Sequence, residues 1–401
     1  MRQRCLLVWG VWLCSLCICG SIRAENVPGR DMYDPAWADS LKTRISGLLQ
    51  DELLATSQLG LSVYDLTSDT ALYAYNARQR MRPASTEKLV TAITALSELG
   101  AGHRFSTRLY FTGEVRDGVL WGDFYAVGGF DPCFGKEDLE YLVDAVEEMG
   151  VDSVAGRLYA DVSMKDTLQW GWGWCWDDDM PVLTPLLYDR KDDFLEAWGG
   201  MLRARGIGFV SAGKARCPSD AVWTAQCGHT LEDILPRMMK ESDNLYAESV
   251  FYQLAAQSGK PYASREEALY PIERLIGRMG YDPGHYVVAD GSGVSLYNYL
   301  SAELEVAFLR YAHHNREVFP ALYAALPIAG TDGTLRRRMK KGKAHGNVRA
   351  KTGTLEGVST LAGYATARNG HRLAFCIMNQ GVASLRAAQA FQDRLCELLC
   401  R

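Results

Sequence analysis

The alternation of apolar and polar residues predicts β-strands near both ends of the chain. Residues 60–66 and 71–76 lie on either side of a polar turn and are expected to pair as two strands. Closer to the C-terminus, three further strands are expected at 348–353, 360–366 and 373–378. The last two are joined through Asn369-Gly370, a strong signal for a tight hairpin. The pattern therefore predicts a strand pair near the start of the chain and a meander near its end.

Apolar residues that recur every three or four positions predict helices between these strands. In the stretch 85–99, Leu89 and Ile93 lie on one helical face. A longer helical stretch, 231–254, contains Pro236, which is expected to kink or restart the helix because proline lacks a backbone N–H. The remaining helices are expected at 41–54, 139–149 and 384–399.

Strands at both ends of the chain, with helices between them, predict one domain that is split in the sequence. We expect an α+β fold whose five-stranded antiparallel sheet and helices come from 25–102 and 229–401. Residues 103–228 are then an inserted smaller domain, in which 105–127 resembles a small β unit. The sequence contains no internal repeat and no low-complexity linker between these parts.

The bulk composition narrows the function classes. The chain has 401 residues, of which 48% are apolar, so it can bury a large core and exceeds one ordinary compact domain. The formal net charge of -5 is mild, and nucleic acid is therefore not expected as a partner. One basic cluster is interpreted as a solvated helix end and turn, and it comprises Arg336, Arg337, Arg338, Lys340, Lys341 and Lys343.

The first 24 residues have the features of a secretory signal peptide. Arg2 and Arg4 precede the apolar run 6–18, and Ala24 follows as a small residue at the expected cleavage site. The run is shorter than the roughly 20 residues that span a bilayer. We therefore predict an exported, periplasmic protein. Membrane or wall association stays open, since a cysteine in this segment could carry a lipid anchor.

Seven cysteines follow the predicted signal peptide, and an odd number leaves at least one thiol unpaired in an oxidising compartment. They are Cys133, Cys175, Cys217, Cys227, Cys376, Cys396 and Cys400. Cys217 and Cys227 flank a short loop and are the expected disulfide pair. His229 lies near both in sequence, but the spacing matches no zinc pattern. We therefore predict no metal, and the proposed chemistry requires no organic cofactor.

The first candidate for chemistry is Ser85-Thr86-Glu87-Lys88, at the start of an amphipathic helix. A step of three residues places Ser85 and Lys88 one turn apart on one face. A serine hydroxyl is a weak nucleophile until a neighbouring base takes its proton, and a helix N-terminus favours developing negative charge. The alternative is an ordinary helix cap followed by a surface lysine. The same spacing recurs at 211–214, where no helix is expected to follow.

The second motif is Ser242-Asp243-Asn244, the only Ser-x-Asn in the chain, within the long helical stretch. Ser242 can relay a proton. The side-chain amide of Asn244 can hold a substrate amide through a donor and an acceptor. The alternative interpretation is a polar kink between two helix segments.

The third motif is Lys351-Thr352-Gly353, the only Lys-Thr-Gly in the chain, on a predicted strand. Lys351 supplies positive charge, Thr352 offers a hydroxyl, and Gly353 lets a substrate backbone come close. A strand edge can also bind an extended peptide through main-chain hydrogen bonds. The alternative interpretation is a common surface tripeptide.

The three motifs, in this order, form the set found in β-lactamases and penicillin-binding proteins. The chain resembles the class C low-molecular-mass penicillin-binding proteins, the D-alanyl-D-alanine carboxypeptidase/endopeptidase family. The similarity covers nearly all of the mature chain. Further runs that agree with the family are Gly128-Gly129-Phe130-Asp131-Pro132, Trp174-Cys175-Trp176-Asp177-Asp178, Ala289-Asp290-Gly291-Ser292-Gly293 and Ala329-Gly330-Thr331-Asp332-Gly333-Thr334-Leu335.

The resemblance implies a penicillin-binding/serine β-lactamase-like domain that acts on peptidoglycan stem peptides through an acyl-enzyme and is acylated by β-lactams. Ser85 would be the nucleophile, Lys88 its base and Ser242 the proton relay. Burial and a nearby second amine would lower the pKa of Lys88. Asn244 and Lys351 would complete the catalytic set. Substrate-binding residues would be Thr352, Gly353, Thr354 and Asp178, with the N–H groups of Ser85 and Thr354 as the oxyanion hole.

Two departures from the family pattern affect what the resemblance implies. The insertion is shorter than usual, so the second of the family's two inserted domains is reduced. Leu296 replaces an arginine that is expected to contact a charged substrate side chain, which leaves the third residue of the stem peptide open. The alternatives are a non-catalytic peptidoglycan-binding protein, or a β-lactamase or esterase on the same scaffold. The sequence leaves the oligomeric state open.

Overall fold

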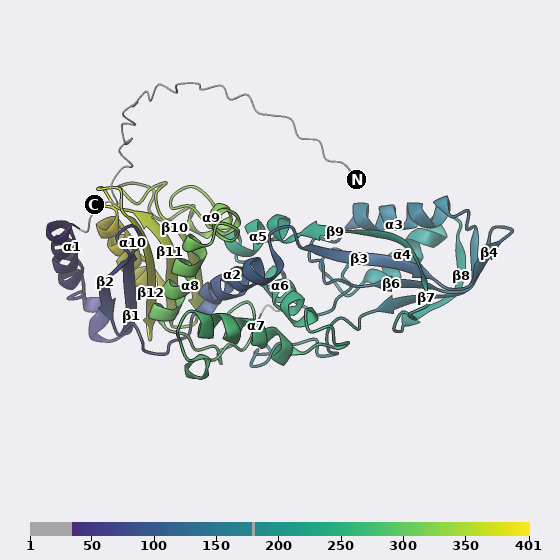
Figure 1. Ribbon diagram of the computed structural model, residues 1–401, viewed down its shortest axis with the longest axis horizontal. Helices are drawn as coiled ribbons and strands as arrows, with labels where there is room; N and C mark the ends of the chain where they lie inside the picture. Colours follow the sequence, from purple (N-terminus) through teal and green to yellow (C-terminus); the bar gives the residue numbers. More distant parts are fainter. Residues whose placement is uncertain (1–33, 179–180) are drawn as a thin grey trace, which may run out of the picture.

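The computed structural model describes residues 34–178 and 181–401. The predicted signal peptide, 1–24, lies outside these residues. Figure 1 shows an elongated molecule, with one sheet and most helices at the end coloured purple and yellow and a second sheet at the teal end. Over the described residues, no helix combines the length and apolar character needed to cross a membrane.

The first sheet is antiparallel, and its five strands come from both ends of the chain as predicted. Their order is β10-β11-β12-β1-β2. In its centre, Leu61 of β1 lies opposite Ile377 of β12. The strands are β1 (Gln58–Asp65), β2 (Thr70–Tyr75), β10 (Arg349–Leu355), β11 (Val358–Thr366) and β12 (Arg372–Gln380). The predicted α+β class is therefore confirmed.

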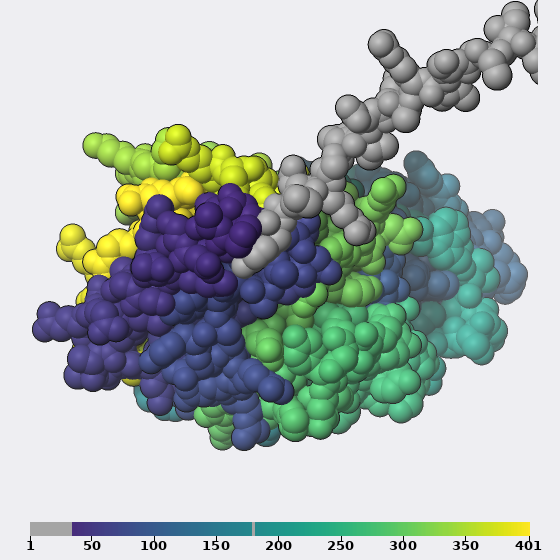
Figure 2. Space-filling model, turned by 60° about the vertical axis from the view of Figure 1, so that its left-hand side comes forward, coloured from purple at the N-terminus to yellow at the C-terminus, as the bar shows by residue number. Residues whose placement is uncertain are grey.

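Helices α1 (Pro35–Leu48) and α10 (Leu385–Leu399) cover one face of this sheet. Alternate strand residues such as Leu61 and Leu361 point to these helices and are fully buried. The purple N-terminal helix and the yellow C-terminal helix lie against each other on this side (Figure 2). The two ends of the described chain thus share one core.

The opposite face packs on a cluster of helices around α2 (Glu87–Leu99). Every residue of α2 from its first residue to Leu96 is buried, which makes it the central helix of the domain. The helices around it are α5 (Leu231–Lys240), α6 (Asn244–Ala256), α7 (Arg265–Arg278), α8 (Ala302–His314) and α9 (Phe319–Ala325).

Three local predictions differ from the structure. The helix expected at 41–54 begins at Pro35, because Asp34 caps it by accepting from two backbone N–H groups. The α-helix of the first motif starts at Glu87, after a short 3-10 turn, η2 (Ala84–Thr86). The break expected at Pro236 lies instead at 241–243, where Ser242 adopts a positive φ of 61°.

The expected disulfide between Cys217 and Cys227 is wrong. All seven cysteines in the described residues are free thiols. The Cys217 thiol points to the carbonyl of Pro218, and the Cys227 thiol points to the carbonyl of Asp138. The two residues are close in sequence, but a disulfide also requires a specific geometry of the two side chains, which this pair does not adopt.

The second sheet is formed by strands between Arg104 and Thr230 and has its own core. Its order is β4-β5-β7-β6-β3-β9, with β8 also paired to β7. Trp198 and Phe124 are fully buried between this sheet and its two helices. The strands are β3 (Arg104–Phe111), β4 (Glu114–Arg116), β5 (Val119–Trp121), β6 (Phe124–Val127), β7 (Ser153–Asp161), β8 (Gly208–Lys214) and β9 (Val222–Thr230), and the helices are α3 (Lys136–Glu148) and α4 (Phe194–Ala204). We retain the division at 103–228 as a proposal, which this separate core supports.

Truncation of Leu361 to alanine is expected to destabilise the first sheet strongly. Its side chain is fully buried beneath α10, and removing such a group typically costs about 2–5 kcal/mol. The measurement is the urea unfolding midpoint. Leu168→Ala is the matched control, because Leu168 is 65% exposed and loses the same atoms. Equal shifts in both variants would contradict the assigned core.

Candidate active site

The first motif lies where η2 meets α2, with its serine reachable and its lysine buried. Lys88 Nζ donates a hydrogen bond to Ser85 Oγ over 3.0 Å. Lys88 is 0% exposed, whereas Ser85 is partly exposed. The residue before the serine, Ala84, holds a positive φ of 49°. This local turn presents the hydroxyl to the outside while its amine neighbour stays in the protein interior.

Lys88 joins three separate segments of the chain. Besides Ser85, its amine donates to Asn244 Oδ1 over 2.8 Å and to the carbonyl oxygen of Ser292 over 2.7 Å. An ammonium group has three N–H donors, so this set uses all of them. The amine must therefore lose a proton before it can act as a base.

The second motif forms the connection between α5 and α6. Asp243 caps α6 through the N–H of Leu245. It also accepts hydrogen bonds from Arg190 over 2.6 Å and from Arg237 over 2.9 Å. Burial alone would raise the pKa of Asp243, but these two arginines lower it overall. The ion pairs fix the turn that presents Ser242 and Asn244.

The third motif lies on β10, the edge strand of the first sheet. Lys351 is 0% exposed, and its Nζ donates to Ser242 Oγ over 2.8 Å. Thr352 bonds to the hydroxyl of Thr334 over 2.8 Å, and Thr354 is exposed. The strand thus brings the third motif within hydrogen-bond distance of the second.

Gly353 is required where β10 passes the serine turn. A Cβ atom there would lie 2.1 Å from Thr360 Oγ1, 2.7 Å from the Pro83 carbonyl oxygen and 2.9 Å from the Ser85 nitrogen. These distances are far below van der Waals contact, and two of the atoms belong to the backbone. The strand can approach Ser85 this closely only because position 353 has no side chain.

Burial sets the protonation of the two amines. It lowers the pKa of Lys88 from 10.5 to about 8, against the opposing charges of Asp290 and Glu248. The pKa of Lys351 lies well below its usual value because burial and the charge on Lys88 both disfavour its protonated form. At pH 7 a group with a pKa near 8 is neutral in roughly one tenth of the molecules.

Buried carboxyl groups beneath Lys88 are functional candidates that the sequence analysis missed. Burial raises the pKa of Glu248 to about 8 and that of Glu305 to about 7. It raises the pKa of Glu87 well above its usual value as well. Glu248 accepts from the N–H of Gly291 over 3.1 Å, next to the carbonyl that holds Lys88. Its position four residues after Asn244, on the same helical side, was the available signal.

Asp290 organises the loop that holds Lys88 from the other side. Its carboxylate is 2% exposed and accepts from the N–H groups of Gly293 and Ser295, each over 2.7 Å. The indole N–H of Trp174 donates to it over 2.8 Å. A run that resembled the family thus positions the Ser292 carbonyl, although we had assigned no role to it.

Among the described residues, no hydrogen bond or ion pair links the side chain of Asp178 to the three motifs. Its carboxylate accepts from the N–H of Cys175 over 2.7 Å and closes its own turn. Asp179 lies outside the described residues. The tryptophan-rich run 170–176 that precedes Asp178 is a loop. A role for Asp178 in substrate binding stays a prediction.

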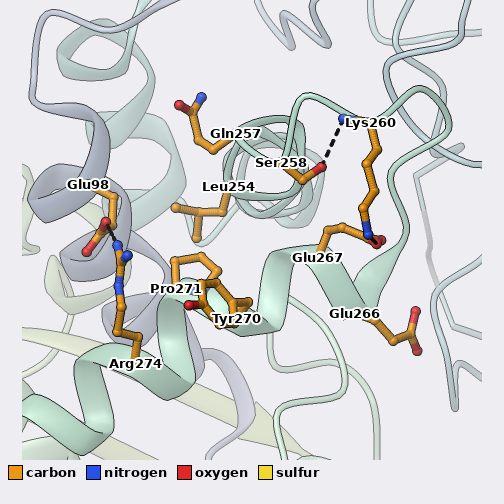
Figure 3. Close-up of a pocket in the computed structure, with 10 residues that line it drawn as sticks. All are labelled: Glu98, Leu254, Gln257, Ser258, Lys260, Glu266, Glu267, Tyr270, Pro271 and Arg274. Atoms are coloured by element: carbon orange, nitrogen blue, oxygen red, sulfur yellow. Dashed lines mark hydrogen bonds and ion pairs between the residues drawn. The ribbon is translucent and has the colours of Figure 1, made fainter.

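A separate pocket lies away from these motifs. Figure 3 shows it between α2, α6 and α7, with a volume of about 520 Å³ and with Arg274 paired to Glu98 at one side. None of its ten lining residues belongs to the three motifs. The candidate active site is therefore identified by the hydrogen bonds among the three motifs and not by this pocket.

A sequence model of the D-Ala-D-Ala carboxypeptidase 3 (S13) family matches residues 41–186 and 190–401. The chain belongs to this family. One relative of this S13 chain is the D-alanyl-D-alanine carboxypeptidase of Actinomadura sp. strain R39. The two are 28% identical over 90% of this chain and 87% of the relative.

Solved structures support the same fold for the S13 chain. Penicillin-binding protein 4 (dacB) of Haemophilus influenzae matches with a TM-score of 0.80 and 24% identity, over 89% of this chain and 99% of that one. The predatory peptidoglycan endopeptidase Bd3459 of Bdellovibrio bacteriovorus matches with a TM-score of 0.57 and 17% identity, over 86% and 92%. These structures show the shared fold, and the S13 match over most of the chain confirms the resemblance to the penicillin-binding protein family.

Substitution of Gly353 by alanine is expected to slow acylation of this S13 chain by a β-lactam about 100-fold. The added methyl group must push β10 away from the serine turn, and a displacement of about 1 Å has this order of effect. Stopped-flow acylation rates provide the measurement. Gly200→Ala, on a helix with open space around the position, is the matched control. A Gly353→Ala rate equal to that of the control would refute the close approach.

Proposed function

We propose that the chain is a serine D-alanyl-D-alanine carboxypeptidase/endopeptidase that cleaves peptidoglycan stem peptides through an acyl-enzyme. One observation carries the proposal: Ser85 Oγ lies 3.0 Å from the amine of Lys88, which also reaches Asn244 over 2.8 Å. The Ser242–Lys351 pair, at 2.8 Å, completes the arrangement. Family membership and the names of the relatives agree with this reaction.

In the first step, the neutral amine of Lys88 removes the proton of Ser85, and Oγ attacks the carbonyl carbon between the two terminal D-alanines. The backbone N–H groups of Ser85 and Thr354 bind the oxyanion, at about 3 kcal/mol for each donor. Ser242 passes a proton to the leaving amine. The C–N bond breaks, the last D-alanine leaves, and the peptide stays bonded to Ser85 as an ester.

In the second step, water attacks the ester and restores the free serine. The exposed edge of β10 binds the extended peptide through its main chain, with Thr352 and Gly353 against the substrate. A β-lactam acylates Ser85 in the same way, but its leaving group stays tethered and blocks the water. A structure of the Bdellovibrio endopeptidase Bd3459 acylated by penicillin G shares this fold.

Leu296, which is 37% exposed, stands at the position expected to contact the side chain of the third stem-peptide residue. Because Leu296 carries no charge, this position favours an uncharged neighbour over the carboxylate that an arginine would bind. We further propose export to the periplasm, where peptidoglycan is accessible. The apolar run and flanking arginines of the first 24 residues support this location.

As the pH rises, the acylation rate is expected to increase roughly tenfold per pH unit up to about pH 8 and then to level off. Only the neutral form of Lys88 accepts the serine proton, and burial places its pKa at about 8. The measurement is the acylation rate with a β-lactam between about pH 6 and pH 10. A rate that stays flat across this range would exclude Lys88 as a titrating base.

Incubation with penicillin is expected to add the mass of one drug molecule to the protein, and Ser85→Ala is expected to abolish this adduct. Intact-protein mass spectrometry measures it. Ser211→Ala is the matched control, because Ser211 and Lys214 repeat the spacing of the motif on the exposed strand β8. The parent is also expected to release D-alanine from purified wall peptides.

The outcomes separate this function from its rivals. An adduct that persists in Ser85→Ala removes Ser85 as the nucleophile. Peptidoglycan binding without any adduct or released D-alanine indicates a non-catalytic binding protein. Rapid turnover of the β-lactam, with no long-lived adduct and no D-alanine release, indicates a β-lactamase or esterase.

A further inference from the structure

Three side chains of the types that bind transition metals meet where the inserted sheet joins α5. Asp131 and Cys133 lie in the turn that follows β6, and His229 lies near the end of β9. One oxygen, one sulfur and one imidazole nitrogen from these residues all lie within 4.8 Å of one another. Figure 1 places the end of β9 directly before α5, between the two sheets. The cysteines considered beside His229 from the sequence, Cys217 and Cys227, are not in this group.

The three donor atoms lie near the spacing of ligands around one small ion, and a small adjustment would accommodate it. His229 Nδ1 lies 2.8 Å from Asp131 Oδ2. Zinc bonds to oxygen, nitrogen and sulfur measure about 2.0–2.3 Å, so ligand atoms around a tetrahedral ion lie roughly 3–4 Å apart. A small outward movement of the half-exposed His229 ring would admit the ion. The present pair is also an ordinary Asp–His hydrogen bond, and the thiol beside it distinguishes this cluster from such a pair.

The backbone fixes two of the three ligands in advance. The side chain of Asp131 is 0% exposed, and its Oδ1 accepts the N–H of Cys133 over 2.9 Å. This bond turns Oδ2 toward His229. Phe130, just before the aspartate, has a positive φ of 51° and is fully buried, which anchors the turn. The imidazole is 35% exposed and leaves a route from solvent.

The surrounding charges favour a cation. Besides Asp131, the carboxylates of Asp138 and Asp233 act on His229. The positive groups nearby are Arg237, which acts on Cys133, and Arg104, which acts on Asp233. Neither arginine forms an ion pair with Asp131 among the described residues. Apart from the Cys133 N–H bound to Oδ1, the groups gathered at the buried carboxylate are the Cys133 thiol and the His229 ring.

We propose that Asp131, Cys133 and His229 bind one Zn²⁺ ion, with water at the fourth position. Sulfur and imidazole ligands select zinc and similar ions over magnesium or calcium. Binding releases the thiol proton, and the neutral imidazole coordinates through Nδ1 with its own proton on Nε2. The proposal is independent of the reaction assigned to Ser85.

The ion would join the inserted sheet to the second motif. The Cys133 thiol lies 3.4 Å from the hydroxyl of Tyr246, on α6. The guanidinium groups of Arg190 and Arg237 lie over the Tyr246 ring, and the same two arginines hold Asp243. A metal at Cys133 would therefore fix the position of the insert relative to the turn that presents Ser242. Its role is structural, and it lies outside the proposed chemistry.

The test is metal titration of the full mature chain after treatment with EDTA and dialysis. ZnCl₂ is titrated by calorimetry, and CoCl₂ is titrated by absorption spectroscopy to detect a thiolate–cobalt charge-transfer band. We expect one ion per chain and a rise in melting temperature with zinc. Cys133→Ser and His229→Gln are each expected to weaken zinc binding about 100-fold or more, because each removes one of three ligands. Cys133→Ser also removes the cobalt band.

Cys217→Ser and His285→Gln are the matched controls, because they remove another partly exposed thiol and another exposed imidazole of the same chain. Both are expected to bind zinc like the parent. A parent chain that binds no zinc overturns the proposal, as does equal binding by the parent and both ligand variants. If Cys133→Ser alters the circular dichroism spectrum, His229→Gln decides the result, since its partly exposed ring can be replaced without disturbing the core.

Discussion

A fully buried amine is the constraint on which the rest of this structure depends. Over the described residues, Lys88 contacts no carboxylate in an ion pair, and its hydrogen bonds go to a hydroxyl, an amide oxygen and a backbone carbonyl. Burial of an unpaired charge costs several kcal/mol, so the protein must hold all three acceptors in place or let the amine lose its proton. The structure does both. The acceptors come from different parts of the chain, and the pKa falls to about 8.

The buried carboxyl groups near the two lysines also affect the protonation of their amines. Two amines without neighbouring negative charge would both become neutral, and Lys351 could then no longer supply positive charge to a substrate. When they are ionised, the carboxyl groups of Glu248, Asp290 and Glu305 favour the protonated form of these amines. The site therefore keeps Lys88 near its point of titration.

Much of this arrangement could be predicted from the sequence because its signals are local. Alternation along β1 and β12 and the helical spacing around Leu89 indicated the sheet and its central helix. The order of the three motifs indicated the family. The carbonyl of Ser292 could not be found in this way, since a backbone acceptor carries no side-chain signal. Likewise, the end of α5 depends on the left-handed conformation of Ser242, and the more obvious proline left that helix intact.

The pairing of β1 with β12 has a consequence for when the first sheet can form during synthesis. Gln58 lies opposite Gln380, so the central strands of the first sheet are separated by nearly the whole chain. Contacts between such distant segments form late, because a long loop must close before they are made. During synthesis the N-terminal strands therefore wait without their main partner until the last strands emerge. The site is likewise incomplete until β10 emerges, because Lys351 and the edge strand that carries it belong to the last part of the chain.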